Sequence, residues 1–154
     1  MAGEIEKRLG EMGFDLPAAP APAANYVPYV VLGDLVYVSG QISQSEDGLM
    51  VGRLGETVEV PEGAKAARAC ALSLLAQVRA ACDGDLDRLV RTVKLAAFVN
   101  STPDFTDQPA VVNGASDFLG EVLGEAGRHA RSAVGVAALP RGVMVEIEGI
   151  FQIR

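Results

Sequence analysis

Alternating apolar and polar residues predict two closely spaced strands near the start of the main body of the chain. Residues 26–32 and 35–40 are short and rich in valine and tyrosine, and Gly33-Asp34 separates them. Glycine and aspartate are typical of tight turns, so the two segments are predicted to form an antiparallel hairpin. A short third strand is expected near residues 49–51, within a polar stretch that contains several glycines.

Two longer segments carry apolar residues at helical spacing, with a long β-branched strand at residues 89–99 between them. Pro61 opens the first helix, which extends to about Cys82, and Pro109 opens the second; proline is tolerated in a first turn because its missing N–H needs no partner there. The core face of the first helix is predicted to consist of Ala67, Cys70, Ala71, Leu74, Leu75 and Val78. That of the second is predicted to consist of Val111, Ala115, Phe118, Leu119 and Val122.

The last part of the chain has the pattern of two further strands, residues 131–139 and 143–151, which are predicted to form a hairpin. A two-residue connection would place Arg131 on the same face as Glu146 and Glu148, and a connection one residue longer would place it on the opposite face. The pattern leaves both registers open. It also allows a plain alternative, a surface arginine and a solvated row of glutamates.

The order β-β-(β)-α-β-α-β-β predicts an α+β domain in which two helices cover one face of a mixed sheet. The opposite face would then need cover as well, because several strand residues are too apolar to face water. The residues assigned to that face are Val36, Val38, Val93, Leu95 and Val145. A homo-oligomer that packs sheet against sheet is the expected solution.

Residues 1–24 are predicted to form an extension, and residues 25–154 the main domain. The extension begins with an amphipathic helix, in which Ile5, Leu9 and Met12 recur at helical spacing. A stiff segment rich in proline and alanine follows, with little tendency to form a helix.

Composition argues against several kinds of binding partner. The chain has 154 residues, a net charge of −7 and only 5% aromatic residues, so a nucleic acid is not an expected partner. No secretory signal or long apolar run occurs, so no membrane contact is expected. Cys70 and Cys82 lie too far apart along one helix for a disulfide and are predicted to be small buried residues. Free thiols favour the cytoplasm.

Motifs for metal and nucleotide chemistry are absent from the sequence. His129 is the one histidine, the cysteines lack paired zinc spacing, and no phosphate-binding glycine loop or nucleophile elbow occurs. The chemistry is therefore expected to run without a metal or other cofactor.

The C-terminal motif Ala130-Arg131-Ser132-Ala133-Val134, followed by Leu139-Pro140 and Val145-Glu146-Ile147-Glu148, resembles the signature of the Rid family of reactive-intermediate deaminases, also called the YjgF family. The resemblance covers residues 25–154. It also includes Pro28-Tyr29, Ser39-Gly40-Gln41, Val93-Lys94-Leu95, Phe98-Val99, Asp104-Phe105 and Val112-Asn113. It implies a chorismate-mutase-like α+β fold and a homotrimer with clefts between subunits. It also implies hydrolysis of small enamines and imines derived from amino acids to a keto acid and ammonia.

The resemblance also implies roles for individual residues. Arg131 matches the arginine that holds the substrate carboxylate, a task that suits a guanidinium because it binds carboxylates through two parallel hydrogen bonds. Glu146 matches the acidic residue that positions or activates water, and partial desolvation is expected to raise its pKa. The positions matched to the substrate cleft are Tyr29, Ser39, Gly40, Asn113 and Ala133.

Three departures from the family pattern leave the substrate open. Many members have cysteine where this chain has Ala133, the loop 106–109 looks longer than in the smallest members, and His129 stands where proline is frequent. Two other functions compete with the hydrolase. One is a trimeric module that binds small carboxylates without turnover, and the other is a ribonuclease, which the net charge of −7 disfavours.

Overall fold

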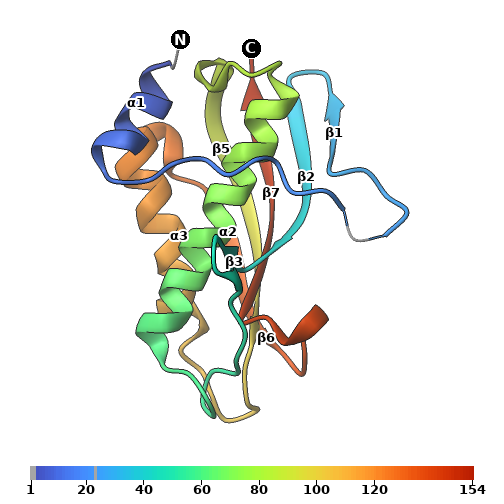
Figure 1. Cartoon of the computed structure of the whole chain (residues 1–154), viewed down its shortest axis with the longest axis vertical. Helices are drawn as coiled ribbons and strands as arrows, with labels where there is room; N and C mark the ends of the chain where they lie inside the picture. The colour runs from blue at the N-terminus through green and yellow to red at the C-terminus, as the bar shows by residue number, and fades with distance from the viewer. Residues whose placement is uncertain (1–2, 23) are drawn as a thin grey trace.

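A five-stranded sheet with two long helices on one face forms the body of the protein in a computed structural model, which describes residues 3–22 and 24–154 (Figure 1). In spatial order the strands are β1 (Tyr29–Leu32), β2 (Leu35–Ile42), β7 (Val145–Ile153), β5 (Leu89–Asn100) and β6 (Ala130–Val136). The helices are α1 (Glu4–Glu11), α2 (Val60–Ala81) and α3 (Gln108–Leu123). The small elements are β3 (Gln44–Ser45), β4 (Gly48–Leu49) and three 3₁₀ turns, η1 (Leu86–Arg88), η2 (Gly124–Gly127) and η3 (Pro140–Gly142). The predicted α+β class and the two-helix layer are confirmed.

The first hairpin is as predicted. β1 and β2 pair antiparallel with Leu32 opposite Leu35, so Gly33 and Asp34 form the two-residue turn. Gly33 has a φ of 63°, a left-handed conformation that glycine adopts without strain. The β1–β2 ladder ends at Val38, and the Ser39 N–H adds one bond to the Pro28 carbonyl, so β2 has an open edge only beyond Ser39.

The predicted C-terminal hairpin is wrong. β6 pairs parallel with β5, and β7 pairs antiparallel with the other side of β5, so β5 lies between the two predicted partners. α3 supplies the crossover that a parallel pair needs, leading from the end of β5 back to the start of β6. The short connection after β6 is the turn η3, in which Arg141 has a φ of 58°.

The predicted helix faces are confirmed. All six residues assigned to the core face of α2 are fully buried, and those of α3 are buried as well. Cys70 and Cys82 are free and buried, as expected for small apolar residues. Desolvation raises the pKa of the Cys70 thiol well above its ordinary value, with a smaller contribution from Glu146.

Four of the five residues predicted to form an uncovered sheet face do not lie there. Val36, Val38, Leu95 and Val145 are buried on the side covered by the helices, whereas Val93 is only half-buried. The opposite face, called the outer face below, instead exposes apolar side chains from alternate positions of the same strands. Val30 is 53% exposed and its strand partner Tyr37 is 41% exposed.

The N-terminal segment is attached to the domain by specific contacts. The backbone N–H groups of Glu4 and Ile5 donate to the Asp87 carboxylate, which offsets the unpaired donors of the first turn of α1. Arg8 donates to the carbonyl of Val122 at the end of α3, and Leu9 is buried. The boundary between residues 24 and 25 remains a prediction.

Close packing of α2 on α3 makes Gly114 a sensitive position. A Cβ atom there would collide with the carbonyl oxygen of Ala64, a backbone atom that cannot move without shifting α2. Gly114→Ala is therefore expected to lower the free energy of unfolding by about 1–3 kcal/mol. The matched control is Gly120→Ala in the same helix, where the Cβ would meet open space and better helix propensity adds up to about 1 kcal/mol. Urea denaturation at one fixed protein concentration measures both, and equal stability of the two variants would contradict the prediction.

Candidate functional site

Arg131 lies at the edge of the sheet, on the side covered by the helices. It pairs with Leu95 of β5, whose side chain is buried under the helices, and this register directs Arg131 toward α3. The guanidinium donates from Nη1 to Ser116 Oγ at 3.0 Å and from Nη2 to the carbonyl of Pro109 at 3.4 Å. Two contacts from one helix thus fix the orientation of the cationic group.

His129 extends this set of hydrogen bonds. Its Nδ1 lies 2.6 Å from the carbonyl oxygen of Gly127, which can only accept, so Nδ1 carries the proton. Nε2 lies 2.9 Å from Ser116 Oγ and accepts from that hydroxyl in the neutral ring. Burial lowers the pKa of His129, the bond to Gly127 opposes this, and the charge of Arg131 lowers it further. The ring is therefore neutral at pH 7, and the cation that contacts Ser116 is Arg131.

These groups line a concave region of about 890 Å³ between α3 and the start of β6. Asn113, predicted from the sequence to contact substrate, lines the same region, one helical turn before Ser116. Ser116 was missed by the sequence analysis. Its spacing of three residues from Asn113 is the signal that could have identified it, because residues three apart share a helix face. Asp117, Glu121, Glu125 and Arg128 complete the charged lining.

Glu146 lies in a different cavity, of about 360 Å³, at the open edge of β2. The β2–β7 register shifts between Val38 and Gln41, and this bulge brings Gly40 against Glu146. A Cβ on Gly40 would collide with Oε1 of Glu146, so a larger residue there would displace the carboxylate from this position. Ser39, Gly40 and Arg141 line the cavity with Glu146. Partial burial, and then the charge of Glu148, raises the pKa of Glu146 above its ordinary value.

Two other predicted site residues line neither of these cavities. Tyr29 pairs with Val38 and packs its side chain against the hydrophobic core. Ala133 pairs with Ala97 on the same face of β6 as Arg131 and also packs against the core. Of the seven predicted residues, Arg131 and Asn113 thus share one cavity, and Ser39, Gly40 and Glu146 share the other.

Arg131 and Glu146 lie on opposite faces of the sheet within one protomer. Alternate residues of β7 are buried under the helices, and Glu146 and Glu148 occupy the other positions, which face outward. The two-residue hairpin register would have placed Arg131 on one face with Glu146 and Glu148. The structure does not have this arrangement.

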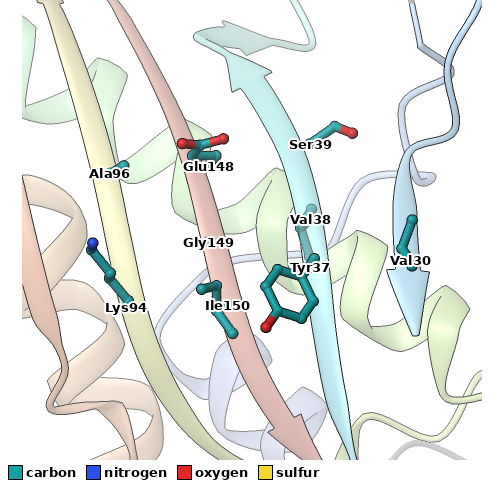
Figure 2. A pocket seen from close by; sticks show the side chains of 9 residues that line it. All are labelled: Val30, Tyr37, Val38, Ser39, Lys94, Ala96, Glu148, Gly149 and Ile150. Carbon is teal, nitrogen blue, oxygen red and sulfur yellow. The ribbon is translucent and has the colours of Figure 1, made fainter. Parts of the chain in front are cut away.

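The outer face carries a third, shallow depression of about 320 Å³, shown in Figure 2. Figure 2 shows Lys94 and Glu148 on neighbouring strands, with Tyr37 and Ile150 beside them. Apolar and charged groups are thus mixed on a sheet surface that no helix of the described chain covers.

Within residues 3–22 and 24–154, no group of three or more His, Cys, Asp or Glu side chains could hold a metal ion. None of the helices in the described part of the chain combines the length and apolar character that a membrane crossing requires.

The fold and its cavities define a class, the α+β domains with a chorismate-mutase-like mixed sheet. A family model described as "YjgF/chorismate mutase-like, putative endoribonuclease" matches residues 6–147. The chain belongs to this YjgF family, which is also the Rid family, and the resemblance noted in the sequence is confirmed.

Individual relatives agree with this assignment. Protein TCP17 of Trypanosoma cruzi is 51% identical over 99% of this chain and 96% of its own length. The crystal structure of Atu1372 from Agrobacterium tumefaciens, a protein of unknown function, has a TM-score of 0.92 and 48% identity, covering 98% of this chain and 93% of its own. A 2-iminobutanoate/2-iminopropanoate deaminase of Dermatophagoides farinae is 33% identical over 87% of this chain and 90% of its own length.

Proposed function

We propose that the protein hydrolyses small imines and enamines derived from amino acids, giving a 2-keto acid and ammonia. The observation that carries the proposal is the placement of Glu146, a partly desolvated carboxylate beside a glycine, in a cavity large enough for a small acid. A carboxylate with a raised pKa is a better base toward water. Family membership and the name of the Dermatophagoides relative support the same reaction class.

The proposed reaction needs two groups. Arg131 holds the substrate carboxylate with two parallel N–H donors, and Glu146 accepts a proton from the water that attacks the imine carbon. The proton then passes to the nitrogen of the tetrahedral carbinolamine. Glu146 next transfers the hydroxyl proton of the carbinolamine to the same nitrogen, so that the C–N bond breaks, ammonia leaves and the carbonyl forms. General acid–base catalysis of this kind contributes about 10²–10⁴-fold in rate.

Because Arg131 and Glu146 lie on opposite faces, the proposed site needs more than one copy of the chain. We propose a homotrimer in which the β6 edge of one subunit, carrying Arg131, meets the Glu146 cavity of the next. The exposed apolar residues of the outer face, among them Val30 and Tyr37, support an assembly that covers this face. Each trimer would then hold three shared sites.

Subunit complementation tests the shared site. Arg131→Ala and Glu146→Gln chains, each inactive alone, are co-expressed with different affinity tags, and trimers that carry both tags are isolated. In a mixed cyclic trimer one of the three interfaces joins an intact Arg131 to an intact Glu146, so about one third of wild-type activity is expected. No recovery in verified mixed trimers would contradict a shared site, and a monomer by light scattering would contradict the trimer.

The alternative is a trimeric module that binds small carboxylates without turnover. Arg131 alone would serve that role, and the desolvated Glu146 gives no advantage to it, because a second negative charge near the ligand weakens carboxylate binding. Acceleration of the hydrolysis of enzymatically generated 2-aminoacrylate, followed through the keto acid by lactate dehydrogenase, favours the hydrolase. Carboxylate binding without acceleration favours the module.

A further inference from the structure

The cavity that contains Glu146 has one wall made by the N-terminal segment. Pro20, Ala21 and Pro22 line it together with Ser39, Gly40 and Glu146. Residues 17–22 are called the 17–22 wall below. In Figure 1 the chain between α1 and β1 crosses the front of α2 and runs on toward β2, which brings this segment to the open edge of the sheet.

A buried glutamine holds the wall in place. Gln77 of α2 is 1% exposed, and its Nε2 donates to the carbonyl of Pro20 at 2.6 Å. The same atom lies 3.5 Å from Oε1 of Gln41, whose own Nε2 donates to the carbonyl of Ser39 at 2.8 Å. Burying an amide is costly unless it is hydrogen-bonded. These bonds therefore couple the wall to the bulge that carries Gly40.

Contacts before the wall fix its approach. Arg79 donates to the carbonyl of Pro17 at 3.3 Å and pairs with Glu6 at 3.2 Å. Phe14 packs edge-on against Phe118 of α3 with ring centroids 5.2 Å apart, and the Arg68 guanidinium lies over its ring. Prolines at positions 17, 20 and 22 restrict the backbone further. The wall is thus stiff and anchored to α2, and Phe14 before it packs on α3.

The chemistry of the cavity is asymmetric. The wall presents the methyl group of Ala21 and the rings of two prolines, and the charged groups of the lining are Glu146 and Arg141 on other segments. An aliphatic group placed against the wall gains from desolvation, whereas a charged group there would lose water without gaining a partner.

We propose that the 17–22 wall receives the side chain of the substrate and selects imines with short, uncharged aliphatic side chains. This inference rests on the proposed function and adds a role for the N-terminal segment. It makes Ala21 a specificity-determining residue and Gln77 a positioning residue that acts through the wall.

Chain-length selectivity tests the proposal. The values of kcat/KM are measured for 2-iminopropanoate, 2-iminobutanoate and 2-iminopentanoate in the wild type and in two variants. Ala21→Leu adds bulk to the wall and is expected to lower the ratio of the five-carbon to the three-carbon substrate by about tenfold or more, the usual scale for one methylene group in an apolar pocket. Ala19→Leu is the matched control, because Ala19 is exposed like Ala21 but does not line the cavity, and it should leave the ratio unchanged.

Gln77→Leu provides a second test, in which the expected change in the ratio has the opposite direction. Freeing Pro20 should widen the cavity and raise the same ratio above that of the wild type, while far-ultraviolet circular dichroism reports whether the variant folds. If Gln77→Leu does not fold, the Ala21→Leu and Ala19→Leu pair decides alone. Equal ratios for these two variants would overturn the proposal even if the wild type is an active hydrolase.

A binding measurement separates this failure from failure of the proposed function. Calorimetry with pyruvate, 2-oxobutanoate and 2-oxopentanoate gives the same selectivity without turnover, and 2-oxoglutarate adds a charged side chain. If no substrate is turned over but the order of affinities depends on the wall, the hydrolase function is rejected and the role of the 17–22 wall is retained. If substrates are turned over but Ala21→Leu leaves the affinities unchanged, the role of the 17–22 wall is rejected and the hydrolase function is retained. Tighter binding of 2-oxoglutarate than of 2-oxopentanoate would also overturn the proposed role of the 17–22 wall.

Discussion

Replacing Arg131 by alanine is expected to lower kcat/KM by at least about 100-fold, because each lost hydrogen bond to a charged group costs about 1.5–3 kcal/mol and two are removed. The guanidinium is held by Ser116 and the carbonyl of Pro109, so it enters the proposed complex already oriented. Arg131→Lys keeps the charge without the two parallel donors and should recover only part of the loss. Steady-state kinetics with enzymatically generated 2-iminopropanoate measure the effect.

Arg128→Ala is the matched control for Arg131. Arg128 lines the same concave region, carries the same charge, and has a side chain that is 76% exposed, where it pairs with Glu125 at 3.7 Å. A surface pair of this kind contributes little, so kcat/KM should change less than about threefold. Equal losses in the two variants would mean that general electrostatics, rather than a specific carboxylate contact, explains the result. Loss of the trimer in Arg131→Ala would instead make Arg131 a structural residue.

Replacing Glu146 by glutamine is expected to lower kcat by about 10²–10⁴-fold with a much smaller effect on KM, because the amide cannot accept the proton from water. In the wild type, activity should fall as the pH drops through the pKa of Glu146, which burial and Glu148 raise above the ordinary value of 4.5. The acid limb of the pH–rate profile therefore reports this group, and it should be absent in Glu146→Gln. An unchanged kcat would remove Glu146 from the mechanism.

Glu148→Gln is the matched control for Glu146. It removes the same charge from the same face of β7, two residues away. Because the charge of Glu148 raises the pKa of Glu146, this variant should keep its activity and shift the acid limb to lower pH.

The raised pKa of Glu146 also affects folding stability. A carboxyl whose pKa is raised by folding opposes folding once it ionises, so Glu146→Gln should not be less stable than the wild type at neutral pH.

Local patterns were sufficient where one segment decides its own structure. The Gly33-Asp34 turn fixed the first hairpin, because such residues favour a two-residue connection regardless of the rest of the chain. Helical spacing identified the apolar face of α2, because residues three and four apart lie on one side of a helix. The motif around Arg131 and Glu146 indicated the family, which the family model confirmed.

Patterns could not decide which strands become neighbours. Alternation tells which residues of a strand share a face, but it does not tell which face or which partner. β6 and β7 looked like a hairpin because a short connection joins them, yet β5 offers β6 a parallel edge after the α3 crossover and pairs with β7 on its other side. The relative placement of Arg131 and Glu146 depends on that choice, so the hairpin register could not give it.

The sequence by itself thus determined the elements, the buried faces of the helices and the family of this protein, because each depends on residues close together along the chain. Only the tertiary structure decided that Arg131 is held by Ser116 on one side of the sheet while Glu146 lies beside Gly40 on the other. The same holds for the 17–22 wall, whose contact with Gln77 joins residues 57 positions apart. Contacts between distant segments arise from packing of the whole chain, which no local spacing encodes.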